Sequence, residues 1–169
     1  MDWCIRVLDA ADAESYRHIR LEALRSDPEA FGSTYEREAA FTLESVRDRL
    51  VPTDHKFTLG AHNEDGMLVG IVTFVRETSV KAAHKGSVYG MFVSPNCRGK
   101  GAGRALMTVM LQKASEQGGL EQVNLTVVTD NAPARKLYEA LGFVTYGCER
   151  NALKHNGRYY DEDLMVYRY

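Results

Sequence analysis

The chain has few of the residues that would place it in several specialised classes of protein. Cys4, Cys97 and Cys148 are its three cysteines, and they stand far apart. This spacing argues against a disulfide framework and against a zinc site, so we expect free thiols. The five histidines are equally dispersed and form no HExxH motif, so we expect no metal. No apolar run approaches the roughly 20 residues that cross a membrane, so we expect no membrane span.

The sequence also lacks an excess of either charge. Lys and Arg number 21 against 23 Asp and Glu, for a formal net charge of −2. Such a balance gives no global attraction for nucleic acid, so a local group of cations is better matched to a small anion. Hydrophobic residues make up 44% of the chain and charged residues 26%, which is typical of a folded globular protein.

The length of the chain and its first residues predict the number of domains and the compartment. At 169 residues the chain is long enough for one domain and short for two, so we expect a single domain over residues 1–169. The initial stretch MDWCIRVL has neither the basic flank nor the long apolar segment of a signal peptide. We therefore expect a cytoplasmic protein.

Hydrophobic periodicity predicts an α/β chain. Strands are expected at residues 4–8, 56–62, 67–76, 85–93, 123–128, 143–149 and 160–168. Helices are expected from DAADAES to residue 26, from 42 to 50, from about 101 to 118 and from 131 to 142. The stretch AFGSTYERE, residues 30–38, is expected to be a loop held by aromatic side chains. VNLTVV, residues 123–128, is apolar enough for a strand buried on both faces.

The segment RGKGAGR, residues 98–104, combines three glycines with three cations between an apolar strand and an amphipathic helix. Glycine permits positive φ and close approach of a ligand to the backbone. The start of a helix presents unpaired N–H groups and the positive end of the helix dipole. Together these features predict a binding site for an anion such as a phosphate.

Two common phosphate-binding motifs do not fit this segment. A Walker A loop needs Ser or Thr after the lysine, but Lys100 is followed by Gly101. A dinucleotide-binding fingerprint needs a third glycine where Arg104 stands. What remains is an R-x-x-G-x-G pattern that follows an apolar strand ending in Val-Ser-Pro.

That pattern, together with N-x-x-A-x-x-LY-x-x-LGF at residues 131–143, resembles the GNAT superfamily of acyl-CoA-dependent N-acetyltransferases. The resemblance is most specific from Val88 to Phe143. It implies a mixed, mostly antiparallel, twisted sheet of about seven strands, splayed near the fourth and fifth strands, with helices on both faces. It also implies acetyl-CoA as co-substrate, an amine acceptor, and a possible homodimer.

The resemblance further implies roles for individual residues. The loop amides of Arg98, Gly99, Lys100, Gly101, Ala102, Gly103 and Arg104 would hold the coenzyme A diphosphate. The strand at Met91, Phe92 and Val93 would pair with the pantetheine arm as an added strand. Asn131 would contact the same arm. Tyr138 would be the catalytic acid that protonates the departing thiolate.

The sequence does not identify the general base. A lysine-like amine has a pKa of about 10.4 and must lose a proton before it attacks the thioester. Many members of the superfamily use a Glu on the strand before the loop, where this chain has Tyr89 and no carboxylate. The candidates for the base are Glu36, Glu149, Asp161, Glu162 or a chain of waters. An α-amino acceptor, with a pKa of about 7.7 to 8.0, would need less help.

The sequence leaves alternatives open for the acceptor and for whether the protein is an enzyme. The acceptor is expected to be a small amine or an amino-acid-like metabolite, with a protein N-terminus or lysine as the alternative. A small acceptor should show a closed pocket walled by the first helices and the last hairpin, and a protein acceptor an open groove. A sensor that binds acyl-CoA without turnover, and a nucleotide-binding module, are the two further hypotheses.

Overall fold

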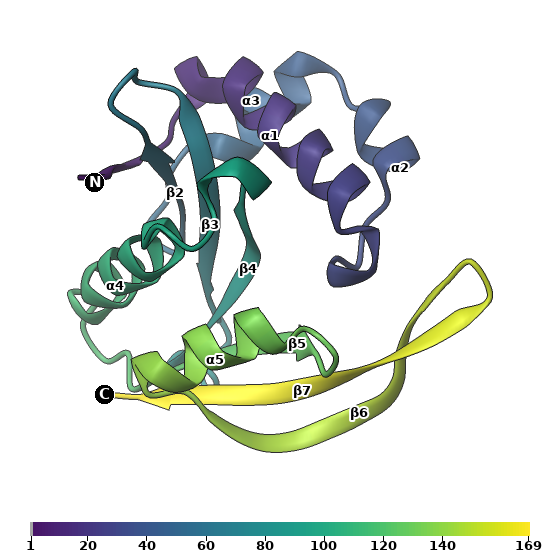
Figure 1. The fold of residues 1–169 in the computed structure, drawn as a ribbon. Helices are drawn as coiled ribbons and strands as arrows, with labels where there is room; N and C mark the ends of the chain where they lie inside the picture. Colours follow the sequence, from purple (N-terminus) through teal and green to yellow (C-terminus); the bar gives the residue numbers. More distant parts are fainter. Residues whose placement is uncertain (1) are drawn as a thin grey trace.

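The computed structural model describes residues 2–169, which form a seven-stranded sheet with helices on both faces (Figure 1). The strand order across the sheet is β1-β2-β3-β4-β5-β7-β6. The strands are β1 (Cys4–Val7), β2 (Lys56–His62), β3 (Leu68–Arg76), β4 (Lys85–Val93), β5 (Gln122–Val128), β6 (Val144–His155) and β7 (Arg158–Arg168). The helices are α1 (Ala13–Ser26), α2 (Tyr35–Ala39), α3 (Leu43–Leu50), α4 (Ala102–Ser115) and α5 (Ala132–Leu141), with 3-10 turns at Ala10–Asp12, Pro28–Ala30 and Pro95–Cys97.

Two hydrophobic cores lie on opposite faces of the sheet. On one face, Ile19 of α1 and Val46 of α3 pack with Ile71 of β3. On the other face, the apolar side of α4 packs against β2, β3 and β5, and Tyr138 of α5 belongs to the same core. Burial of these apolar side chains is the main favourable contribution to the fold. The predicted arrangement of helices on both faces is confirmed.

The sheet is antiparallel except at its centre, where β4 and β5 run parallel. These two strands pair over three residues only, from Lys85 with Gln122 to Ser87 with Asn124. Beyond that point the register of the described chain contains no further β4–β5 pair, and the strands diverge. The predicted splay between the fourth and fifth strands is therefore confirmed, and it leaves one edge of β4 without a strand partner.

Helix ends follow the signals that the sequence carries. The Thr42 hydroxyl accepts a hydrogen bond from the Ser45 amide and caps α3. The Asn131 side chain accepts one from the Ala134 amide, 3.3 Å away, and caps α5. Gly142 follows α5 with a φ of 104°, which ends the helix in the left-handed conformation that glycine favours.

Three expectations were wrong in detail. The stretch at 30–38 is not all loop, because Thr34 caps the short helix α2 there. The last hairpin is longer than expected on both arms, since β6 runs to His155 and β7 starts at Arg158. Its ends project beyond the rest of the sheet (Figure 1), and its exposed residues carry no core periodicity. Finally, β5 is buried mainly on one face, because Thr126 is exposed on the other.

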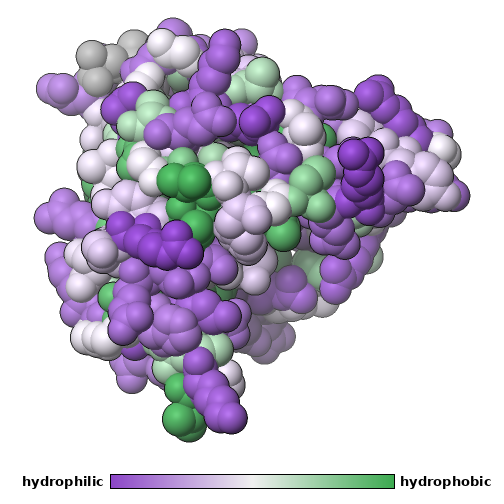
Figure 2. Space-filling model, turned by 90° about the horizontal axis from the view of Figure 1, so that it is seen from below, coloured by the Kyte–Doolittle hydropathy of each residue, from purple (hydrophilic) through white to green (hydrophobic). Residues whose placement is uncertain are grey.

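Within residues 2–169 no helix is both long and apolar enough to cross a membrane. The face seen from below is largely hydrophilic, and the hydrophobic residues visible there form small separate groups (Figure 2). Val144 and Tyr146, on the edge strand β6, are among the large hydrophobic residues that are exposed.

Candidate active site

The divergence of β4 and β5 opens a cavity of about 830 Å³, which we call the splay cleft. It is lined by β4, the 97–104 loop, the end of β5, the start of α5 and the 27–31 turn. All the residues predicted to bind the coenzyme line it except Lys100, and so does Tyr138. The Lys100 side chain instead donates to the Asn96 carbonyl, 2.9 Å away. The structure thus brings the two halves of the sequence motif together in one cleft.

The glycine loop presents a row of amides at the start of α4. Gly101 precedes the helix with a φ of 89°, a conformation that disfavours a side chain. In the described part of the chain, the backbone amides from Gly99 to Arg104 have no hydrogen-bond partner, whereas Ala105 donates to the Gly101 carbonyl. Free N–H groups at the positive end of a helix dipole suit a diphosphate. These residues therefore fit the anionic part of coenzyme A.

Gly103 is required for a different reason. It lies inside the first turn of α4, and a Cβ there would stand 3.2 Å from both Leu137 Cδ2 and Met91 Cε. Such contacts are tighter than ordinary van der Waals contacts, so a larger residue would require the Leu137 and Met91 side chains to shift. The absent side chain keeps the amides of the loop close to the strand edge.

Arg98 holds the loop against the rest of the protein. Its Nε donates to the Val93 carbonyl at 2.9 Å, and its Nη2 lies 2.5 Å from Asp27 Oδ2 at the end of α1. The guanidinium also lies over the Phe92 ring, 5.3 Å from its centroid. The sequence predicted Arg98 to be part of the loop that binds the diphosphate. Its contacts here give it a structural task as well.

The strand edge facing the cleft is shaped by a β-bulge in β4. Thr73 pairs with Tyr89 and Ile71 with Phe92, so an extra residue of β4 is accommodated between them. Gly90, at the bulge, has a φ of 61°. A bulge redirects a strand and is a common device beside binding sites. The Phe92 ring is buried in the core under α1, which leaves its backbone to face the cleft.

Tyr138 lies on the buried face of α5, with 6% of its surface exposed. Its ring packs against Phe143, with 5.9 Å between the ring centroids. Burial raises the pKa of the Tyr138 hydroxyl above its usual value, so the group carries its proton at neutral pH. A protonated hydroxyl beside the cleft can donate a hydrogen bond or a proton to a leaving group. Asn131, at the start of α5, lines the same cleft while capping the helix.

The four carboxylates proposed as bases differ in their surroundings. Glu36 is exposed on α2 and lines neither cavity described here. Asp161 accepts a hydrogen bond from the Asn151 amide. Glu149 and Glu162 face each other across β6 and β7. Burial and the charge of Glu149 raise the pKa of Glu162, and a hydrogen bond from Thr126 opposes the rise.

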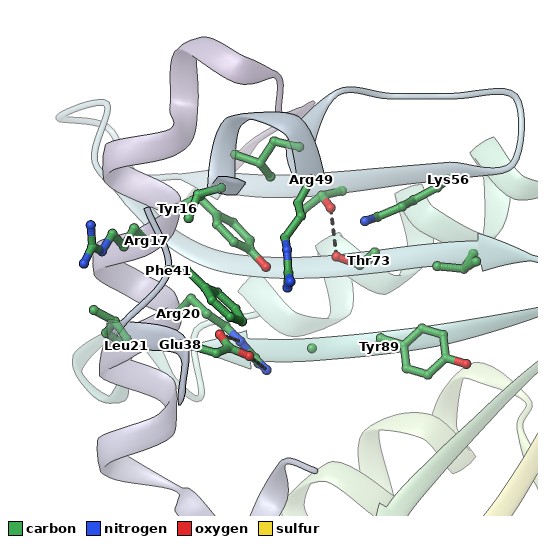
Figure 3. Close-up of a pocket in the computed structure, with 15 residues that line it drawn as sticks. Tyr16, Arg17, Arg20, Leu21, Glu38, Phe41, Arg49, Lys56, Thr73 and Tyr89 are labelled. Carbon is green, nitrogen blue, oxygen red and sulfur yellow. Dashed lines mark hydrogen bonds and ion pairs between the residues drawn. The ribbon is translucent and has the colours of Figure 1, made fainter. Parts of the chain in front are cut away.

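A second cavity of about 260 Å³ lies between the first three helices and the face of β2, β3 and β4 (Figure 3). We call it the basic cavity, because Arg17, Arg20, Arg49 and Lys56 line it. Tyr89 and Gly90 line both this cavity and the splay cleft. Sequence reasoning missed the basic cavity, since its cations come from three separate elements and form no motif. Among residues 2–169, no group of three His, Cys, Asp or Glu side chains is placed to hold a metal.

Comparison with known proteins assigns a family to this arrangement. Residues 14–143 match the model of the Acetyltransferase (GNAT) family. A mycothiol acetyltransferase of Segniliparus rotundus is 34% identical over 128 residues, which cover 74% of this chain and 48% of that protein. The L-amino acid N-acetyltransferase AaaT of Escherichia coli is 31% identical over 102 residues, 60% of this chain and 62% of the other. The chain spans about half the length of the curated relatives that it matches.

Solved structures agree over almost the whole chain. An acetyltransferase of the GNAT family from Streptococcus pneumoniae has a TM-score of 0.88 and 25% identity, covering 99% of this chain and 100% of that one. A phosphinothricin acetyltransferase from Sinorhizobium meliloti, solved in complex with AcCoA, has the same fold. Its TM-score is 0.83 at 22% identity, with 99% of this chain and 89% of that chain covered. The chain belongs to the GNAT family of acetyltransferases.

Proposed function

We propose that the protein transfers an acetyl group from acetyl-CoA to the primary amine of a small, amino-acid-like acceptor. The observation that carries this proposal is the meeting of two cavities at Tyr89 and Gly90. One is a long cleft that ends at unpaired helix amides, and the other is a small cavity on the far side of the same bulge. A donor in the first and an acceptor in the second would meet at the bulge of β4.

The donor side would be held by backbone groups. The amides from Gly99 to Arg104 would bind the diphosphate, and the unpaired edge of β4 would hydrogen-bond the pantetheine arm as an added strand. Acetyl-CoA supplies the acetyl group as an activated thioester. The amine forms a C–N bond to the acetyl carbon while the C–S bond breaks, and the Tyr138 hydroxyl gives its proton to the departing sulfur.

The proton of the attacking amine needs an acceptor, and we assign this role to Glu162, acting through a water molecule. Its raised pKa brings it closer to neutrality than an ordinary carboxylate. Its hydrogen-bond partner Thr126 lines the splay cleft. Glu162, Glu36, Glu149 and Asp161 all line neither cavity, so the proton would reach Glu162 through a water molecule beside Thr126.

The size of the basic cavity favours a small acceptor over a protein. Its volume of about 260 Å³ between α1, α2, α3 and the strands β2 to β4 suits an amino-acid-sized molecule better than an extended peptide. The last hairpin, expected to be a wall of the acceptor pocket, contributes no residue to this cavity, although its Tyr160 lines the splay cleft. The amino acid acetyltransferase among the relatives supports the same acceptor size.

Mass spectrometry of the purified protein tests this proposal. The protein would be incubated with acetyl-CoA and a pool of amino acids, polyamines and aminoglycosides, and in parallel with a peptide library. Acetylated small molecules are the expected result. Acetylated peptides alone would replace the proposal with a protein acetyltransferase. Binding of acetyl-CoA with no acetylated product in either pool would overturn it in favour of an acyl-CoA sensor.

A further inference from the structure

We propose that the basic cavity binds an anionic group of the acceptor, so that the preferred substrates are primary amines carrying a carboxylate a few bonds from the nitrogen. This inference rests on the proposed transferase function and adds the chemical class of the acceptor. It is carried by the charges, the contacts and the position of the cations around the cavity.

The lining of the basic cavity has a strong excess of positive charge. Four cationic side chains line it, and Glu38 is its one carboxylate among the described residues. Figure 3 shows the Arg20 and Arg49 side chains entering the same space from α1 and α3, with Glu38 beside Arg20. Cations gathered in a recess attract an anion and repel a second cation. This environment is unsuited to a polyamine and suited to an amino acid carboxylate.

Within the described chain, one nitrogen of the Arg20 guanidinium is not engaged in a hydrogen bond. Its Nε and Nη2 bind the two oxygens of Glu38 at 2.8 and 3.0 Å, which occupies that carboxylate in a bidentate pair. Its Nη1 is buried and has no hydrogen-bond partner in residues 2–169. A buried donor without a partner carries a free-energy cost, and an oxyanion would remove that cost.

Among residues 2–169, Arg49 and Lys56 lack a carboxylate within ion-pair distance. Neither takes part in an ion pair within the described chain. The Arg49 guanidinium lies over the Phe41 ring, 4.2 Å from the centroid, and both residues line the cavity. Burial and the charge of Arg49 lower the pKa of Lys56. Two cations that disfavour each other's charge would both gain from an anion between them.

The free donor of Arg20 also sets the distance between the anion and the reacting nitrogen. Its Nη1 lies 3.6 Å from the position of a Cβ on Gly90, at the bulge shared with the splay cleft. An oxyanion bound to this donor would therefore lie next to the point where donor and acceptor meet. Only a short spacer fits between the bound anion and the amine, as in an amino acid.

The test compares matched acceptors that differ only in charge. The wild-type protein and the variants Arg49→Gln, Lys56→Gln and Arg47→Gln would be assayed with an amino acid, its amide, and its aminophosphonate counterpart. Arg47 is exposed on the same helix as Arg49 and lines neither cavity, so it is the matched control. Arg20 is left intact because it holds the partly buried Glu38.

We expect the wild type to prefer the acid over the amide by at least about tenfold in kcat/KM. Arg49→Gln and Lys56→Gln should each reduce that preference severalfold by lowering kcat/KM for the acid more than for the amide, and Arg47→Gln should leave the preference as it is. Activity on the phosphonate would identify a general oxyanion site, and its absence a carboxylate site. Equal use of acid and amide, or a preference that survives both substitutions, would overturn the inference.

Failure of the transferase proposal is distinguishable from failure of this one. If no amine is acetylated, calorimetric titration of the amino acid and its amide into the protein still reports on the cavity. Tighter binding of the acid, weakened by Arg49→Gln and not by Arg47→Gln, would support the anion site without catalysis. Equal binding of acid and amide, or no binding of either, would overturn it.

Discussion

Arg98 and Asp27 join the glycine loop to the end of α1, 71 residues earlier in the chain, with 2.5 Å between Nη2 and Oδ2. The same arginine holds the Val93 carbonyl at the end of β4. One side chain therefore connects the loop at the start of α4, the strand edge of the splay cleft, and the helix that supplies Arg20 to the basic cavity. This contact joins segments from the donor side and the acceptor side of the proposed site.

Replacing Asp27 with Asn should weaken coenzyme binding without unfolding the protein. The pair is partly exposed, with 45% and 28% of the two side chains accessible, so its direct contribution is modest. Its loss frees Arg98 and loosens the loop amides. We expect the Kd for coenzyme A, measured by calorimetry, to rise about two- to fivefold. The free energy of unfolding should change by less than about 1 kcal/mol. The control is Asp48→Asn, because Asp48 is an exposed residue of α3. An equal rise in Kd in that variant would contradict this role for Asp27.

Replacing Gly101 with Ala should affect the donor side more strongly. The residue has a φ of 89°, and left-handed backbone costs a residue with a Cβ about 1–2 kcal/mol. The loop would relax and misplace its amides, so the Kd for coenzyme A should rise about tenfold or more. Gly118 is the matched control, because no atom lies within 4 Å of a Cβ built there. Unchanged affinity in Gly101→Ala would show that the loop amides do not bind the diphosphate.

The sequence was most informative where one residue type serves one local geometry. The glycines at 99 and 101 indicated a loop in which positive φ is permitted, and both have positive φ in the structure. Asn131 and Gly142 predicted the limits of α5, and they lie at its two ends. The strands β2 and β4 were predicted with their observed bounds because their apolar runs end at polar or turn residues. Such signals act over a few residues, so they can be read along the chain.

What the sequence did not predict depends on contacts between distant elements. The basic cavity needs Arg20 of α1, Arg49 of α3 and Lys56 of β2 to converge, and nothing in their spacing indicates it. The ion pair of Arg98 with Asp27 likewise joins segments far apart. The extended hairpin was missed because Asn151 has positive φ and the pairing shifts register between Glu149 and Leu153, which interrupts the alternation of a strand.

Replacing Tyr138 with Phe separates catalysis from coenzyme binding. The substitution removes the hydroxyl and keeps the ring that packs on Phe143. General acid catalysis commonly contributes a factor of about 10² to 10⁴, so we expect kcat to fall by at least about 10². The Kd for coenzyme A should change less than about threefold. Tyr167→Phe is the control, since that ring also packs on Phe143 but lines neither cavity. Undiminished turnover in Tyr138→Phe would exclude the hydroxyl as the acid.

Glu162 should set the acidic limb of the pH profile. A base works only when deprotonated, so kcat/KM should fall as the pH drops through its pKa. Burial and the charge of Glu149 raise that pKa, so the limb should lie at a higher pH than an ordinary glutamate would give. Glu162→Gln should lower kcat/KM by at least about 10² and abolish the limb, while Glu116→Gln, exposed at the end of α4, should change neither.

The same residue makes an independent prediction for stability. Because the pKa of Glu162 is higher in the folded protein than in the unfolded chain, the folded state binds more protons between these two values. The free energy of unfolding should therefore decrease as the pH rises through that window, and Glu162→Gln should remove this dependence. Urea denaturation from pH 4 to pH 8 would measure it. An unchanged slope in Glu162→Gln would show that Glu162 is not the group with the raised pKa.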